Sequence, residues 1–255
     1  MPSFAPHQAS ALNPHGTGTP KSAVAWHAHE SGQFILVETG VSHLCTEVGA
    51  WAIPARRVAW VPPGVRHISR SSSTGRGWVI IAPSELGGLP DGVCVVRGSA
   101  LMLAALERLA RLSANEGSMR GWLWHVVASE MADARPEPLV LPMPTSPRLL
   151  RAARSVLTTP SAAATLDDLA RKAGMSRRSF ARHFGTETGL SVAQWKRAVI
   201  AHHALELVAG GQKVSSVALD VGYESVSAFI AMFRRQYGQS PRQFLIENSA
   251  IYHRM

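Results

Sequence analysis

One arrangement of apolar residues, glycine and phenylalanine occurs twice in the C-terminal part of this 255-residue chain, and it limits the possible folds. Each copy has a short apolar segment, a turn glycine and two phenylalanines four residues apart. These residues are Gly174, Phe180 and Phe184 in the first copy and Gly222, Phe229 and Phe233 in the second. The spacing between the copies is too short for two independent domains, but it fits two three-helix units that share one helix. The sequence therefore predicts two helix-turn-helix units in one all-α domain.

The positive charge of the chain is concentrated in the same region. The formal net charge is +9. Residues 148–255 hold 15 Lys and Arg against 7 Asp and Glu, whereas residues 1–147 hold 11 against 10. Because a basic surface neutralises phosphates and releases their counterions, this distribution favours a nucleic acid as the partner of residues 148–255. The alternative is a basic face that is merely solvated.

The cysteines and the N-terminal residues bear on the cellular compartment. Cys45 and Cys94 form neither a disulfide framework nor a CxxC motif, as expected in a reducing cytosol. No stretch approaches the roughly 18 apolar residues of a membrane span, and residues 1–22 lack the apolar core of a signal peptide. We therefore expect a cytoplasmic protein without membrane contact, with residues 1–22 disordered.

Residues 23–97 contain short apolar runs broken by Gly and Pro, a pattern typical of a β-sandwich or barrel. The runs are 34–37, 41–45, 49–53, 58–61, 78–81 and 93–96. His27 and His29 are two residues apart, so on a strand both side chains point to one face. Gln33 follows them, and His67 comes after the turn at 62–64.

These residues resemble the two signature motifs of the cupin fold. The first motif is His27-x-His29 with Gln33, where the family usually has Glu, and the second ends in His67. The resemblance implies a cupin-like sensor barrel over residues 23–97. Three imidazoles and a polar fourth group can hold a divalent ion, for which imidazole favours Zn, Ni, Fe or Cu. The alternative is a polar pocket without metal, in which these side chains hydrogen-bond an organic effector.

Residues 98–134 predict a hairpin of two amphipathic helices. Apolar residues recur at helical spacing over 99–112, with Ser99 as N-cap, and over 119–131, with a turn at 115–117 between them. One face must cover the barrel. A second apolar face would bind another copy of the chain, so we expect either homodimerisation or packing wholly within the subunit.

Residues 135–147 contain five prolines, which remove backbone donors and favour extended chain. This composition predicts a semi-rigid linker between two domains. Pro147 then starts a helix that ends before Pro160. The C-terminal domain is therefore expected to span residues 148–255.

In each repeat the second helix should expose one face, because its two phenylalanines point inward. In the first repeat, Thr165 and Asp168 resemble a capping pair, and Ser176 begins the second helix. Arginine on that helix can give two donors to a guanine edge or one to a phosphate. The residues predicted to face DNA are Arg177, Arg178, Ala181 and Arg182 in the first repeat, and Val226, Ser227, Ile230, Ala231, Arg234 and Arg235 in the second. Ala231 and Val226 are candidates for contact with a thymine methyl, but the apolar face of the second repeat favours positioning over base specificity.

A run of residues in the second repeat matches a family pattern. It is Val217-Ala218-x-x-Val221-Gly222-Tyr223-x-Ser225-x-Ser227-x-Phe229, then Phe233-Arg234, Gly238-x-Ser240-Pro241 and Phe244. This run resembles the AraC/XylS family of bacterial transcription regulators. The resemblance implies an effector-responsive regulator whose two recognition helices enter successive major grooves of double-stranded DNA. It also implies a homodimer on repeated sites, with RNA polymerase as a candidate partner and the nucleoid as location when bound.

Two other functions are alternatives to this regulator: a cupin enzyme and an architectural DNA-binding protein. A metal-dependent cupin enzyme, an oxygenase or isomerase, would use the appended helices only as a DNA tether. A constitutive architectural DNA-binding protein would have a barrel that ignores effectors. No Ser-His-Asp grouping, phosphate loop or pair of acids at a catalytic spacing rises above chance, which disfavours the enzyme. We therefore predict a regulator with an α+β multidomain fold: a cupin-like β-barrel with a helical hairpin, then an all-α double helix-turn-helix domain.

Overall fold

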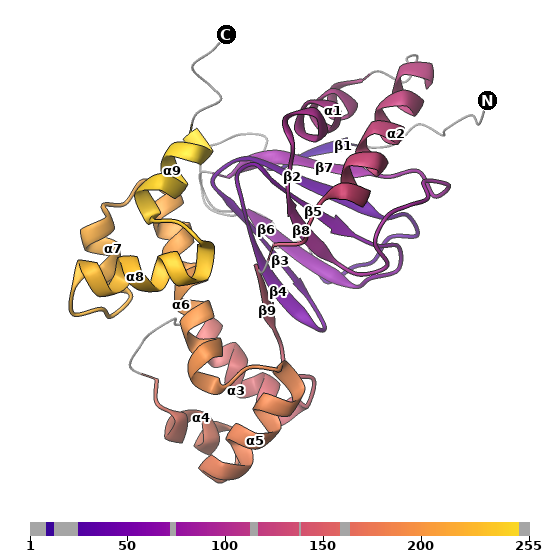
Figure 1. Ribbon diagram of the computed structural model, residues 1–255. Helices are drawn as coiled ribbons and strands as arrows, with labels where there is room; N and C mark the ends of the chain where they lie inside the picture. The colour runs from indigo at the N-terminus through magenta and orange to yellow at the C-terminus, as the bar shows by residue number, and fades with distance from the viewer. Residues whose placement is uncertain are drawn as a thin grey trace. The chain divides into compact units, whose positions relative to one another are not determined.

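A computed structural model describes residues 9–12, 25–71, 75–112, 117–137, 139–158 and 164–249. The chain divides into two compact units, and each is described separately. The first contains Met1–Thr46 and Trp51–Leu139, and the second contains Glu47–Ala50 and Val140–Met255. Strands and two helices make up the described part of the first unit, whereas helices dominate the second (Figure 1).

The strands form two sheets. Their bounds are β1 (Ala9–Leu12), β2 (Gln33–Thr39), β3 (Val41–Thr46), β4 (Gly49–Pro54), β5 (Arg57–Val61), β6 (His67–Ser71), β7 (Arg76–Ile81), β8 (Cys94–Arg97) and β9 (Val140–Pro142). One sheet has the order β1-β7-β2-β5-β8 and the other β6-β3-β4-β9. The pairs β1–β7, β2–β7, β2–β5, β5–β8 and β3–β6 are antiparallel. Each of the six predicted apolar runs therefore overlaps a strand.

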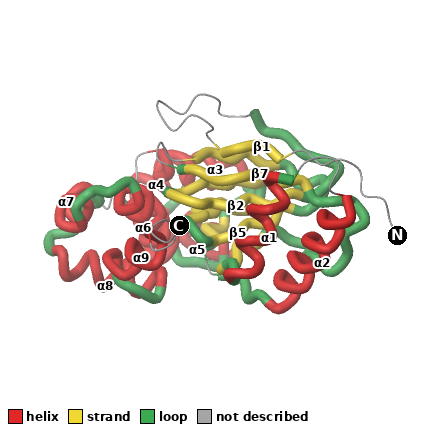
Figure 2. The backbone as a smooth tube through the Cα atoms, turned by 90° about the horizontal axis from the view of Figure 1, so that it is seen from above, coloured by secondary structure: helices red, strands yellow, loops and turns green. Residues whose placement is uncertain are grey.

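The helical hairpin packs on one face of the five-stranded sheet. It consists of α1 (Ala100–Arg111) and α2 (Gly117–Asp133), and in Figure 2 α1 lies next to the strands with α2 beside it. Phe34 of β2 and Trp60 of β5 have ring centroids 4.8 Å apart, and Phe34 lies 5.8 Å from Trp124 of α2. Side chains alternate across a strand, so the neighbours Ile35 and Ala59 are buried on the opposite face. The hairpin thus covers the barrel-like unit as predicted.

The Ser99 side chain caps α1 by accepting the N–H of Met102 at 3.0 Å, as predicted. The prediction of disorder over residues 1–22 does not hold for β1, which pairs with β7; the remainder of that segment lies outside the described residues. Of the predicted turn at 115–117, residues 115 and 116 also lie outside them.

The second unit is a group of seven described helices. They are α3 (Pro147–Thr158), α4 (Leu166–Ala173), α5 (Arg177–Thr188), α6 (Val192–Ala209), α7 (Val214–Asp220), α8 (Val226–Tyr237) and α9 (Pro241–Ser249). α6 is the central helix and packs against α3, α5, α7, α8 and α9. Its core side chains include Trp195, Ala201 and Leu205, each 0% exposed. The segment 135–147, predicted as a linker, contains β9, in which Leu141 is fully buried.

Candidate DNA interface and histidine cluster

The first helix-turn-helix unit is fixed by caps at both helices. Thr165 Oγ1 accepts the N–H of Asp168 at 3.2 Å, and the Asp168 carboxylate accepts the N–H of Thr165 at 3.1 Å. This predicted capping pair is a complete capping box. Gly174 ends α4 with φ +63°, a conformation that disfavours residues with a side chain. Ser176 then caps α5 through the N–H of Ser179 at 3.2 Å.

The second helix-turn-helix unit repeats the turn glycine and the serine cap of its recognition helix, whereas Lys213 gives α7 no side-chain cap. Gly222 follows α7 with φ +86°. The Ser225 side chain caps α8 by accepting the N–H of Ala228 at 3.2 Å. Since each serine fixes the first residue of its helix, it also fixes which side chains face outward. α5 and α8 are the two recognition helices that the sequence predicts.

Arginines dominate the outward face of α5. Phe180 and Phe184 are buried at 0% and 1% exposure, whereas Arg178 and Arg182 are exposed. Arg177 was predicted as part of the same surface, but its guanidinium forms an ion pair with Asp167 of α4, with Nε and Oδ1 3.2 Å apart. Ala181 is only half-exposed. The outward charges of α5 without an ion pair among the described residues are therefore those of Arg178 and Arg182.

The outward face of α8 has different chemistry. Phe229 and Phe233 are fully buried, as predicted. The exposed or half-exposed residues of the first two turns are uncharged: Val226, Ser227, Ala228, Ile230 and Ala231. Val226 is 38% exposed. Arg234 and Arg235 are also exposed, but they lie in the last turn of the helix.

A clasp joins the chain after β9 to the first recognition helix. Glu187 of α5 accepts the backbone N–H groups of Thr145 and Ser146 at 2.8 Å and 2.9 Å, just ahead of α3. Burial of the Glu187 carboxyl opposes ionisation, but the hydrogen bonds from Ser146 and Thr145 outweigh it and lower its pKa. Trp195 of α6 donates its Nε1–H to the carbonyl of Pro142 at 2.8 Å. We refer to these contacts of Glu187 and Trp195 as the clasp.

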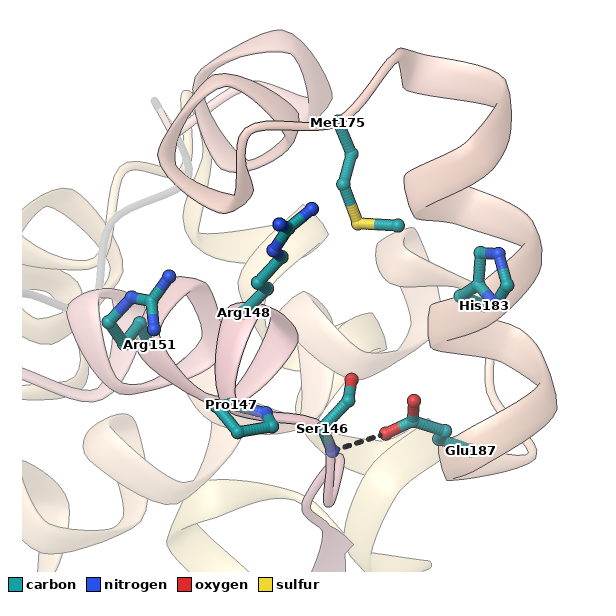
Figure 3. Close-up of a pocket in the computed structure, with 7 residues that line it drawn as sticks. All are labelled: Ser146, Pro147, Arg148, Arg151, Met175, His183 and Glu187. Carbon is teal, nitrogen blue, oxygen red and sulfur yellow. Dashed lines mark hydrogen bonds between the residues drawn. The ribbon is translucent and has the colours of Figure 1, made fainter.

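The clasp borders a cleft of about 460 Å³ in the second unit. In Figure 3 the Glu187 carboxylate faces the backbone of Ser146, while Arg148 projects toward Met175. The lining residues are Ser146, Pro147, Arg148, Arg151, Met175, His183 and Glu187. Glu187 is not predictable from the sequence, because a carboxylate that caps a distant backbone segment has no characteristic spacing.

The three predicted histidines of the first unit come together. Their ring centroids are 4.8 Å apart for His27 and His29, 4.5 Å for His27 and His67, and 5.5 Å for His29 and His67. One candidate ligand atom from each residue can be chosen such that all lie within 4.8 Å of one another. The backbones of His27 and His67 exchange two hydrogen bonds, with N–O distances of 3.0 Å and 2.8 Å, which hold the two residues opposite each other.

The hydrogen bonds of His67 define its tautomer. Its Nδ1 lies 2.8 Å from the carbonyl of Val65 and must donate to it, which leaves a lone pair on Nε2. Gln33 Nε2 lies 2.7 Å from His67 Nε2 and donates to that lone pair. His27 Nδ1 likewise donates to the carbonyl of Ala25 at 2.7 Å. Both tautomers therefore place the ring lone pair on Nε2, and that of His67 is already engaged by the Gln33 amide.

The surroundings of His29 and His67 favour their neutral forms. Burial lowers the pKa of His67, and the charges of His27 and His29 lower it further, against the opposing hydrogen bond to Val65. Burial followed by the charge of His27 lowers the pKa of His29. Neutral imidazole is the form that coordinates metals, so the donor set fits a divalent transition ion. An incoming ion would have to displace the Gln33 amide from His67.

Comparison with known proteins adds to this geometry. A family model described as a helix-turn-helix domain matches residues 169–246. The regulator NimR of Escherichia coli K12 is 28% identical over 237 residues, which cover 92% of this chain and 86% of NimR. RipA of Corynebacterium glutamicum is 34% identical over 119 residues, 46% of this chain and 35% of RipA. A solved DNA-binding domain of AdpA in complex with a target DNA is 30% identical, with a TM-score of 0.40, and covers 43% of this chain and 100% of that domain.

The helix-turn-helix match and the relatives NimR and RipA indicate a DNA-binding transcription regulator rather than an enzyme. More particularly, the helix-turn-helix match and the regulators among the relatives support the resemblance to the AraC/XylS regulators found in the sequence. The expected architecture, a β-rich N-terminal unit and a helical C-terminal unit, is confirmed as well. In the described part of the chain, no helix combines the length and apolarity required to cross a bilayer.

Proposed function

We propose that this regulator recognises asymmetric operator sequences through α5 and α8, under the control of an effector bound by its cupin-like N-terminal unit. The observation that carries the proposal is the matched construction of the two recognition helices. Each begins at a serine cap, buries two phenylalanines and exposes arginine. Two such helices in one unit suit successive major grooves on one duplex, whose helical repeat is about 34 Å.

The exposed side chains divide into two roles. Arg178 and Arg182 lie within the first half of α5, from which helix-turn-helix proteins contact base edges, and each can donate twice to a guanine. Arg234 and Arg235 lie at the far end of α8 and suit phosphates. Arg177, held by Asp167, contributes charge near the duplex rather than a base contact.

A pair of variants tests this division. Arg182→Ala should change the preferred base at one position and also reduce affinity, because it removes a base contact. Arg235→Ala should weaken all sequences alike and reduce the salt dependence of binding by about one phosphate. Affinities for the operator and single-base variants at several salt concentrations provide the measurement. Identical behaviour of the two variants would refute the assignment.

The effector site is assigned to His27, His29 and His67, with Gln33 as fourth group and Zn, Ni, Fe or Cu as the candidate ions. Support comes from the close approach of the three histidines and from the Nδ1 hydrogen bonds of His27 and His67, which leave each Nε2 as the acceptor atom. When bound, a divalent ion supplies a charged Lewis acid that can hold a small molecule at open coordination positions. An organic effector bound without metal is the alternative, and hydrogen bonds from the same side chains would hold it.

Metal content and metal titration distinguish the two effector classes. Elemental analysis of purified protein, followed by titration with Zn²⁺ or Ni²⁺ and tryptophan fluorescence, should show about one ion per chain. His67→Ala should lose this binding, whereas His125→Ala on the exposed surface of α2 should retain it. Binding that survives His67→Ala would contradict the site. Operator affinity that is the same with and without every ligand tested would favour an architectural DNA-binding protein.

We also propose that the regulator forms a homodimer through its helical hairpin. Trp122 and Met119 of α2 are 65% and 50% exposed, and Leu101 of α1 is 56% exposed, although the opposite faces are buried in the core. Sedimentation equilibrium should give a dimer that Trp122→Glu dissociates; a monomeric wild type at tens of micromolar would exclude it. Such a dimer would act in the bacterial cytoplasm, on the nucleoid when bound, with RNA polymerase as its partner at the promoter.

A further inference from the structure

The two recognition helices offer DNA opposite chemistries. The exposed positions in the first half of α5 include Arg178 and Arg182. The first two turns of α8, Val226 to Phe233, contain no charged residue. Their outward side chains are aliphatic, apart from the hydroxyl of Ser227. A helix that only positioned the protein on phosphates would have its donors there, but α8 carries arginine only in its last turn.

An aliphatic surface in the major groove has one specific partner. Among the four base pairs, the C5 methyl group of thymine is the apolar feature that the major groove displays. Contact removes the methyl group and the side chain from water together, which is favourable in proportion to the apolar area buried. Val226 is 38% exposed in the free protein and therefore has surface to bury on binding.

The position of these residues in the helix fits this role. In helix-turn-helix proteins the N-terminal residues of the recognition helix contact base edges. Val226 is the first residue of α8, and Ile230 follows one turn later, with Ala231 beside it. The Ser225 cap fixes the start of the helix, and the buried Phe229 and Phe233 fix its rotation. The aliphatic side chains are therefore held on the outward side.

We infer that α8 specifies sequence by recognising thymine methyl groups through Val226, Ile230 and Ala231, while α5 recognises guanine. The operator then has two unlike halves, one containing G·C pairs under α5 and one containing T·A pairs under α8. This inference rests on the proposed function, in which both helices bind one duplex. It assigns α8 a specifying role, whereas the sequence alone favoured positioning.

Replacement of thymine by deoxyuridine tests the inference directly, because it removes the methyl group and leaves every hydrogen-bonding group of the base in place. An operator is first selected from random duplexes with the full-length protein, and the α8 half is located by footprinting the Arg235→Ala and Arg182→Ala variants. Each thymine is then replaced singly. We expect an affinity loss of about fourfold for each contacted methyl group in the α8 half.

Matched protein variants complete the experiment. Val226→Ala should reduce the thymine-to-uracil affinity ratio toward one at a single position, and Val226 is exposed enough that the fold tolerates the change. Leu219→Ala, which shortens a 68% exposed side chain of α7, should leave every ratio unchanged. Equal affinity for thymine and uracil throughout the α8 half would overturn the inference. Failure to select any preferred sequence would instead overturn the proposed function.

Discussion

Gln33 shows how one side chain sets the properties of the histidine cluster. It is 2% exposed, and its amide donates to the Nε2 lone pair of His67 that a metal would need. A neutral amide is also a weaker ligand for a divalent ion than a carboxylate. In the proposed metal site, Gln33 would therefore lower the affinity for an ion, so that the ion could dissociate, as the proposed sensor requires.

Gln33→Glu should strengthen metal binding. A carboxylate at this position can coordinate the ion and neutralise part of its charge, so we expect the affinity for Zn²⁺ or Ni²⁺ to rise on the order of tenfold or more. Titration calorimetry measures the change. Gln212→Glu, on the exposed surface of the second unit, controls for the added negative charge. An affinity equal to that of the wild type would mean that Gln33 does not lie beside the bound ion.

The cluster was predictable residue by residue, whereas its hydrogen bonds were not. The spacing of His27 and His29 predicted a shared face on a strand, but they lie outside the named strands, and an isolated bridge between His27 and His67 brings the residues together. That Gln33 is bonded to His67 depends on the pairing of strands far apart in the chain, which single-sequence patterns do not define. The pairing of Arg177 with Asp167 was missed for the same reason.

Among the helices and strands, those with an N-cap residue or a clear apolar periodicity were predicted from the sequence. Ser99, Ser176 and Thr165 each begin the expected helix, because a side-chain acceptor at the N-cap acts locally. β6 and β9 were not predicted. β6 is mostly polar, and β9 ends in a proline within a proline-rich segment, so strand propensity was low and tertiary pairing decided their conformation.

The clasp at Glu187 joins α5 to the segment that precedes α3. Glu187 belongs to α5, but its carboxylate accepts backbone N–H groups just ahead of α3. Because hydrogen bonds lower the folded-state pKa of Glu187, its contribution to stability is present above the unfolded-state pKa, about 4.3, and is lost as the pH falls through the folded-state value.

Glu187→Gln should therefore destabilise the helical unit at pH 7, by roughly 1 kcal/mol of unfolding free energy, because charge-assisted hydrogen bonds become neutral ones. The difference from wild type should shrink as the pH falls below about 4.3. Urea unfolding followed by far-UV circular dichroism at pH 7 and pH 4 measures both effects. Glu224→Gln, an exposed change outside the clasp, should cost little at either pH. A pH-independent difference would contradict the account.

For the molecule as a whole, α6 determines the distance between the two recognition helices, α5 and α8. It is 18 residues long, which corresponds to about 27 Å, and it packs against both α5 and α8. The ring of Phe184 from α5 lies edge-on to Trp195 of α6, with centroids 5.3 Å apart. A helix packed in this way on both recognition helices acts as a stiff spacer between them.

The two operator halves should consequently tolerate no change of phase. Insertion of five base pairs between them rotates one half by about 180° relative to the other, so affinity should fall to that of a single half. Insertion of ten base pairs restores the phase but exceeds the reach of α6, and it should rescue nothing. Electrophoretic mobility shifts with the three duplexes provide the measurement. Equal binding to all three would show that one recognition helix suffices.

The uncharged first turns of α8 have one more consequence, for how this regulator would respond to chemical marking of the genome. Cytosine methylated at C5 presents a methyl group in the major groove at the same place as thymine does. An aliphatic side chain such as Val226 contacts that group whichever base bears it. Enzymatic methylation of operator cytosines under α8 would then change occupancy without any mutation, and the altered expression would persist through DNA replication for as long as the mark is copied.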